Sequence, residues 1–136
     1  MEFDMQLKAF KFTKEFFFKG ANKPTTSGLK KVRFTYYLDK KGHVLVNPSE
    51  RKIDFHFTLE MHPDLGEINL DGECVLESPE QQKIQFCLIN QVPPFMRFID
   101  KIILKKCYEN SKKIAEKNNI NFPPVDFLMS IPEKKT

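Results

Sequence analysis

Two histidines and two carboxylates alternate along one stretch of the chain, at Asp54, His56, Glu60 and His62. Imidazole and carboxylate groups bind divalent cations, and residues at even spacing on a strand project from the same face. However, His56 and Glu60 lie about 13 Å apart on an extended strand that rises about 3.3 Å per residue, which is too far for one ion. The pattern therefore favours a solvated polar face, and we predict no metal site.

Three cysteines, Cys74, Cys87 and Cys107, offer possible nucleophiles. Cys87 and Cys107 lie in apolar patterns, where a free thiol behaves as a small buried hydrophobe, and no paired base is identifiable. Asp126 follows two prolines and could be a placed carboxylate, although the N-cap of a short terminal helix is the simpler interpretation. The chain also lacks the common phosphate-loop, nucleophile-elbow and HExxH motifs. We predict no catalytic residue, no cofactor and no enzymatic activity.

The overall composition is that of one globular domain. The chain has 136 residues, 40% apolar and 29% charged, which suits a single domain spanning residues 1–136 with a buried core. No apolar run reaches the ~18 residues of a membrane span, and no secretion signal is visible. The odd number of cysteines without CxxC spacing indicates reduced thiols and a cytoplasmic location. Because the net charge is only +4 with scattered lysine pairs, we expect neither nucleic-acid binding nor membrane insertion.

The hydrophobic periodicity predicts a sheet followed by a long helix. Residues 53–61 show the clearest strand pattern, because apolar and polar side chains alternate with a period of two. The other predicted strands are residues 6–19, 31–38, 43–46, 68–76 and 83–90. From Pro93 the apolar spacing changes to three and four, which predicts a helix to about Asn118. We therefore expect an α+β fold, in which an antiparallel meander packs against a long C-terminal α-helix.

Phenylalanine is unusually frequent, with 14 copies and three in succession at Phe16, Phe17 and Phe18. An extended chain must point at least one of these three rings away from the face that its neighbours bury. One interpretation is that the long helix and the C-terminal segment cover the surplus apolar surface. The other is that the surplus forms an exposed groove or an oligomer interface.

Two segments and the order of the elements resemble the SecB family of protein-export chaperones. The run LKAFKFTKEFFFKGANKP is similar to the first strand of that family, and FPPVDF at residues 122–127 is similar to a segment near its end. Between them come an antiparallel meander, a proline-containing turn and a long helix, as in the family. The resemblance implies a SecB-like domain over residues 1–136.

The same resemblance implies an ATP-independent holdase that binds unfolded or pre-secretory polypeptides in a hydrophobic groove, as a homo-oligomer in the family. Phenylalanine side chains suit this role because they bind apolar segments without reading a fixed sequence. The expected groove residues are Phe17, Phe18, Phe95, Phe98, Phe122, Val125, Phe127 and Leu128. For each the alternative is an ordinary core position, above all for Phe98. An alternative function is a small-molecule or lipid-binding module with an apolar cavity between sheet and helix.

Overall fold

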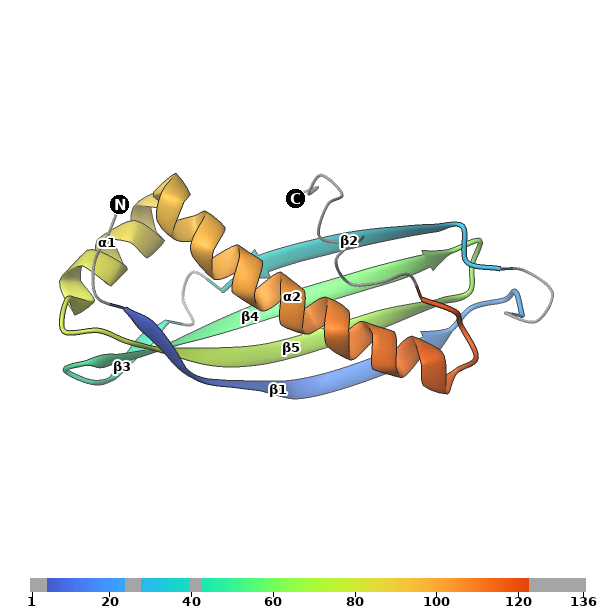
Figure 1. Ribbon diagram of the computed structural model, residues 1–136, viewed down its shortest axis with the longest axis horizontal. Coiled ribbons are helices and arrows are strands. Elements are labelled where there is room, and N and C mark those ends of the chain that lie inside the picture. Colours follow the sequence, from blue (N-terminus) through green and yellow to red (C-terminus); the bar gives the residue numbers. More distant parts are fainter. Residues whose placement is uncertain (1–4, 24–27, 40–42, 123–136) are drawn as a thin grey trace.

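The structure is a computed structural model that describes residues 5–23, 28–39 and 43–122. In this part of the chain, one antiparallel sheet carries two helices (Figure 1). Four strands follow the spatial order β1-β5-β4-β2, and a short β3 also pairs with β4. The bounds are β1 (Gln6–Lys19), β2 (Lys31–Leu38), β3 (Val44–Asn47), β4 (Glu50–His62) and β5 (Gly66–Glu77). The expected α+β class and the predicted strands other than residues 83–90 are confirmed, and β1 pairs with β5 rather than with β2.

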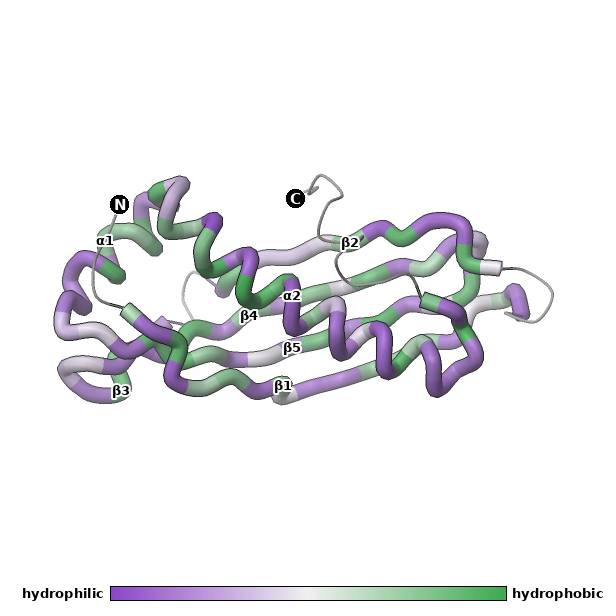
Figure 2. The backbone as a smooth tube through the Cα atoms, in the orientation of Figure 1, coloured by the Kyte–Doolittle hydropathy of each residue, from purple (hydrophilic) through white to green (hydrophobic). Residues whose placement is uncertain are grey.

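Strand β4 determines which face of the sheet is the core. From Arg51 to Met61 its odd-numbered side chains are buried, whereas its even-numbered side chains are half-buried. This alternation follows directly from the period of two in the sequence. The antiparallel register with β5 sets Phe57 opposite Leu70 and Leu59 opposite Ile68, so that apolar side chains of both strands share one face. Figure 2 shows the resulting alternation of hydrophilic and hydrophobic residues along the strands.

The segment 83–90 was predicted as a strand, and this prediction is wrong. It lies within helix α1 (Gln81–Asn90), which buries Gln81, Ile84, Cys87 and Leu88 on one side. Ile84, Phe86 and Leu88 also fit a period of two, and an apolar run of eight residues does not separate the two patterns. Because the segment is a helix, Phe86 and Ile89 point outward and are exposed.

Helix α2 (Pro93–Lys117) confirms the predicted long helix. Pro93 starts it, as expected for a residue that has no N–H to leave unsatisfied in the first turn. The helix crosses the sheet diagonally (Figure 1) and is about 37 Å long at 1.5 Å per residue. Neither of the two described helices is both long and apolar enough to cross a membrane.

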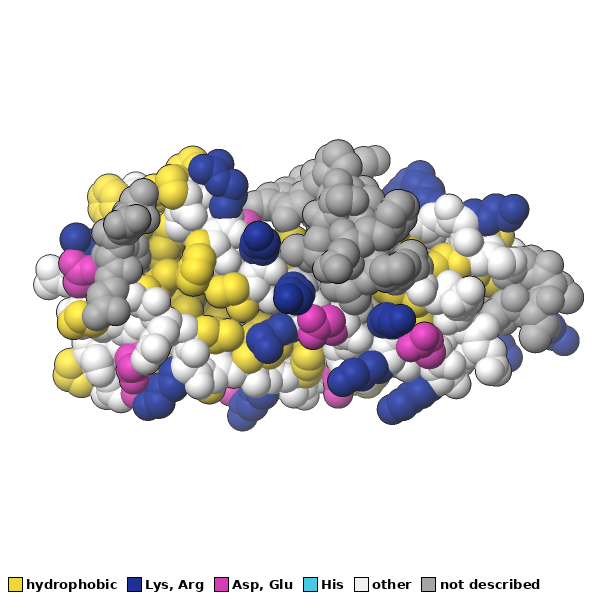
Figure 3. Space-filling model, in the orientation of Figure 1, with side chains coloured by type: hydrophobic (Ala, Val, Ile, Leu, Met, Phe, Trp, Pro, Cys, Tyr) yellow, Lys and Arg dark blue, Asp and Glu magenta, His cyan; other side chains and the backbone are white. Residues whose placement is uncertain are grey.

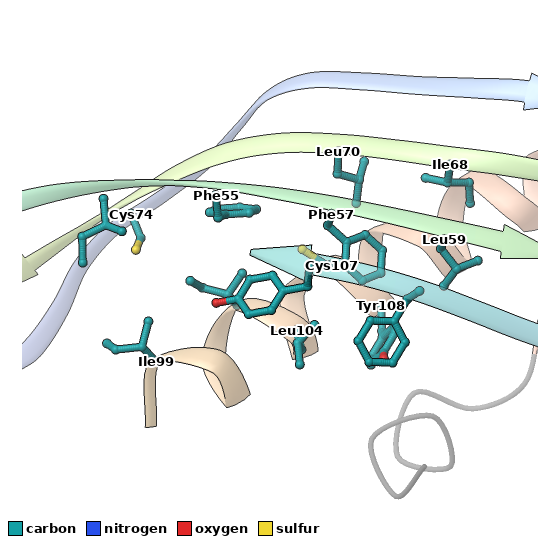
Figure 4. Close-up of a cluster of buried hydrophobic side chains, with 14 of the residues drawn as sticks. Phe55, Phe57, Leu59, Ile68, Leu70, Cys74, Ile99, Leu104, Cys107 and Tyr108 are labelled. Atoms are coloured by element: carbon teal, nitrogen blue, oxygen red, sulfur yellow. The ribbon is translucent and has the colours of Figure 1, made fainter. Parts of the chain in front are cut away.

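The core lies between α2 and the inner face of the sheet. Figure 4 shows Ile99, Leu104, Cys107 and Tyr108 of the helix facing side chains of the strands. The ring of Tyr108 packs edge-on against Phe34 and Phe57, with 5.6 Å between the ring centroids in each pair. Such arrangements match the charge distribution of aromatic rings and fix the position of the helix over the strands.

The three consecutive phenylalanines of β1 divide between the two faces of the sheet. The Phe17 ring is half-buried against the core, next to Gly66. Phe16 and Phe18 lie on the opposite, open face, where their exposed rings stack with centroids 6.2 Å apart. Among the described residues, the exposed phenylalanines are these two together with Phe86 and Phe98. Part of the phenylalanine surplus is therefore accessible to solvent in one subunit.

Candidate functional site

The side chains considered for chemistry do not converge in the part of the chain that the structure describes. His56 Nδ1 lies 2.5 Å from Asp71 Oδ1, and His62 Nε2 lies 3.2 Å from Glu60 Oε2, so the two histidines have separate acidic neighbours. No group of three metal-binding side chains occurs among the described residues. The polar face predicted from the alternation is therefore a set of separate pairs.

None of the three cysteines forms a disulfide, and all three are buried. Burial, and next the charges of nearby Asp54 and Glu73, raise the pKa of the Cys74 thiol to about 12. Burial also raises the pKa of Cys107. Because the thiolate is the reactive form of cysteine, neither group is suited to nucleophilic chemistry near neutral pH. Asp126, the other residue considered, lies outside the described residues.

A pocket of about 540 Å³ lies where both helices meet the end of β2 and the start of β4. We call it the helix-end pocket. Its apolar walls include Leu38 and Ile53 from the sheet side, Leu88 and Ile89 from α1, and Met96 from α2. The remaining lining residues are Tyr36, Tyr37, Asp39, His43, Gln91 and Asp100. An apolar cavity with a few polar groups is the usual form of a binding site.

A second, more open hollow of about 780 Å³ lies at the amino end of α1. We call it the β3 hollow, and its lining residues are Leu45, Asn47, Pro48, Pro79, Glu80, Gln81, Gln82 and Lys83. Strand β3 pairs only with β4 within the described chain, so its outer backbone edge faces away from the sheet. Helix α1 thus has a hollow at each end.

Large apolar side chains are exposed on the elements that contribute to these two hollows, and two of them, Leu45 and Ile89, line the hollows. Helix α1 contributes Phe86 and Ile89, which are 60% and 63% exposed, and α2 contributes Phe98 at 45%. All three apolar residues of β3, Val44, Leu45 and Val46, are also exposed. We call these six residues the apolar end. Figure 3 shows hydrophobic side chains gathered where α1 and the start of α2 lie, whereas charged side chains spread over the rest of that face.

Polar contacts anchor the floor of the helix-end pocket. The buried Tyr36 hydroxyl donates a hydrogen bond of 2.8 Å to Asp100 Oδ1. Burial, followed by the charge of Asp100, raises the pKa of Tyr36, so the hydroxyl keeps its proton. Because this bond joins β2 to α2, it fixes the start of the long helix at the pocket wall.

The sequence-predicted groove residues are spread over the molecule. Phe98 is exposed at the apolar end, whereas Phe95 and Phe122 are 3% and 4% exposed and belong to the core cluster. Phe17 and Phe18 lie on opposite faces of β1. The other three, Val125, Phe127 and Leu128, lie outside the described residues. The five described residues do not form one exposed surface, and their role in binding stays a prediction.

Sequence reasoning missed the contribution of α1 and β3. Phe86 was placed on a strand, and Leu45 was considered only as part of a short strand. The available signal was the spacing of Ile84, Cys87 and Leu88, which leaves Phe86 and Ile89 together on the other side of a helix. Exposed apolar side chains three residues apart on a short helix indicate a contact surface.

Comparison with known proteins relates the chain to others by fold. No family model matches the sequence, and no curated protein matches it. A solved structure of the Mycobacterium tuberculosis Rv1957 SecB-like chaperone, in complex with a ChAD peptide from the Rv1956 HigA1 antitoxin, is similar with a TM-score of 0.56. The similarity covers 88% of this chain and 86% of that chain at 5% sequence identity. The chain therefore has a SecB-like fold.

Proposed function

We propose that this protein is an ATP-independent chaperone of the holdase type, which binds unfolded or pre-secretory polypeptides at the apolar end. The observation that carries the proposal is the set of six exposed apolar side chains on α1, α2 and β3, of which Ile89 and Leu45 each line a hollow. The SecB-like fold supports it, because the similar Mycobacterium tuberculosis chaperone was solved with a bound peptide. Both features suit a protein that binds extended chains.

The chemistry of the apolar end suits clients of varied sequence. Phenylalanine, isoleucine, leucine and valine offer contact area without a hydrogen bond that a client would have to match. The outer edge of β3 adds backbone N–H and C=O groups, with which an extended client can pair whatever its side chains are. Affinity then depends on apolar content and extended conformation, which unfolded chains share.

The proposal includes the remaining features expected from the SecB resemblance. These are a cytoplasmic location, a role in protein export, assembly into a homo-oligomer, and groove residues among Phe17, Phe18, Phe95, Phe98, Phe122, Val125, Phe127 and Leu128. Phe98 is the member of this set that lies at the apolar end. Because Phe95 and Phe122 are buried, their participation requires α2 or its neighbours to move when a client binds.

The test is suppression of aggregation of a chemically unfolded client, followed by light scattering without nucleotide. The proposal predicts suppression at a near-stoichiometric ratio, and addition of ATP should not change it. A variant with Phe86→Ser, Ile89→Ser and Leu45→Ser should lose the effect while its circular dichroism stays unchanged, because all three side chains are exposed. Failure of the unmodified protein to slow aggregation at a fivefold molar excess would overturn the proposal.

The helix-end pocket favours a second candidate function. A volume of about 540 Å³ with apolar walls is within the usual range for a small-molecule site. A lipid or other apolar compound bound there would make the protein a small-molecule-binding module. Native mass spectrometry of the purified protein separates the two functions, since a stoichiometric co-purified compound supports the second.

A further inference from the structure

Arg51 is a buried cation at the start of β4. Its side chain points to the helix side of the sheet and is only 4% exposed. Nε donates to Gln81 Oε1 at 3.3 Å, and Nη1 lies 2.9 Å from His43 Nδ1. Burial of a guanidinium is costly unless an anion compensates its charge. Among the described residues, however, both of these partners are uncharged groups.

Neither described group that Arg51 contacts carries a negative charge, although the carboxylate of Asp39 acts on His43. Burial, and next the charge of Arg51, lower the pKa of His43, so the imidazole is neutral and accepts from the guanidinium. Gln81 is the first residue of α1, whose first turn carries no acidic side chain and no side-chain cap. The amino end of a helix is itself partly positive. A cation therefore lies next to a positive helix end, an arrangement that an anion would stabilise.

Each of the two partners of Arg51 lines one of the hollows, although Arg51 itself lines neither. His43 lines the helix-end pocket, and Gln81 lines the β3 hollow. In the β3 hollow the carboxylate of Glu80 is neutralised by Lys83, whose Nζ lies 2.8 Å from Glu80 Oε1. The helix-end pocket instead carries Asp39 and Asp100. An incoming anion is therefore favoured on the side of the β3 hollow.

We propose that Arg51 recognises a carboxylate of the bound polypeptide, either its C-terminal group or an acidic side chain, while neighbouring client residues contact the apolar end. This inference rests on the proposed function and adds a charge preference to it. The carboxylate approaches from the β3 hollow and replaces Gln81 Oε1 as the acceptor for Nε, because charge-assisted bonds between a guanidinium and a carboxylate are stronger than bonds to neutral acceptors. The preferred client is thus an apolar segment that contains or ends in an acidic group.

The test compares two fluorescent peptides of ten apolar and uncharged residues, one with a free C-terminal carboxylate and one with a C-terminal amide. Their affinities are measured by fluorescence anisotropy at low salt. The unmodified protein should bind the carboxylate peptide about tenfold more tightly than the amide peptide. The difference should shrink in high salt, as exposed parts of the interaction become screened.

Substitutions assign this preference to Arg51. Arg51→Met keeps the apolar stem, removes the buried charge and should abolish the difference between the two peptides. Lys105→Met, on the exposed side of α2, is the matched control, because it removes one charge from the same net charge of +4 and should leave the difference intact. Thermal unfolding verifies that both variants fold, which is expected because removing an uncompensated buried charge is often neutral or stabilising.

A second pair of variants tests the effect of an anion placed beside Arg51 within the chain. His43→Asp places a carboxylate beside Nη1 and should raise the melting temperature while removing the preference for the carboxylate peptide. His43→Asn has the same shape without the charge and should keep the preference. Retention of the preference in Arg51→Met, or in His43→Asp at an increased melting temperature, would overturn the inference.

The outcomes for the unmodified protein separate this inference from the proposed function. Equal binding of both peptides would overturn the role of Arg51 and leave the polypeptide-binding function standing. Absence of binding by either peptide would overturn both. Dodecanoate is the third probe, because a fatty acid also joins a carboxylate to an apolar chain. If dodecanoate binds with the same dependence on Arg51 and neither peptide binds, the ligand is a fatty acid and the polypeptide assignment is wrong.

Discussion

Replacing Phe86 and Ile89 by serine removes the two most exposed large apolar side chains of the described chain. Full burial of such a side chain contributes about 1.5–3 kcal/mol, so covering the exposed three-fifths of each is worth roughly 1–2 kcal/mol. If a client covers about half of that surface, the pair contributes ~1–2 kcal/mol. Since 1.4 kcal/mol corresponds to a factor of about ten, the double variant should bind an unfolded client about tenfold more weakly.

The assay is fluorescence anisotropy of a labelled, permanently unfolded client titrated with each protein. Stability should be unaffected, because both side chains are exposed and serine has nearly the same helix propensity as phenylalanine and isoleucine. The matched control is Phe16→Ser with Phe18→Ser, which removes two rings that are 53% and 56% exposed on the open face of the sheet. The reasoning is refuted if this control weakens binding tenfold while the α1 variant binds normally, a result that would instead support the predicted role of Phe18.

Three further predictions concern the framework of the site. Tyr36→Phe removes the hydrogen bond to Asp100 and should lower the free energy of unfolding by about 1–3 kcal/mol in urea titrations. An unchanged urea midpoint would show that this bond does not anchor α2. Gly72→Ala should destabilise the protein by about 1–3 kcal/mol in the same titration, because the added Cβ would lie 2.3 Å from the Phe55 ring. Gly28→Ala is the control and should have little effect, because its added Cβ would have no atom within 4 Å. Cys74 and Cys107 should not react with a thiol reagent at pH 8 until the protein unfolds, since burial raises the pKa of both thiols, and rapid labelling of either in native protein would contradict their position in the core.

The sheet could be predicted from the sequence because one of its faces is buried. In β4 the alternation from Ile53 to Met61 leaves only one strand register that hides the apolar side chains. The start of α2 could be predicted from Pro93 and from the change in apolar spacing. The pairing of β1 with β5 could not, because the sequence of a strand does not specify which edge of a sheet it joins.

The candidate site was harder to predict, because it depends on which apolar residues remain uncovered. A core position was the predicted alternative above all for Phe98, yet α2 buries Phe95 and exposes Phe98. Arg51 occupies a position that the alternation assigns to the core, and only the structure shows that its partners are His43 and Gln81. The contact of Arg51 with Gln81 depends on helix α1. A strand was predicted at residues 83–90 instead, and this contact could therefore not be foreseen.

The most direct test of polypeptide binding at the apolar end is a backbone amide NMR titration of the protein with an unfolded client. If clients bind at the apolar end, chemical-shift changes should concentrate in residues 43–51 and 81–98, which contain β3, α1 and the first turns of α2. Changes confined to the open face, in residues such as Phe16 and Phe18, would contradict binding at the apolar end, as would a spectrum that the client does not alter.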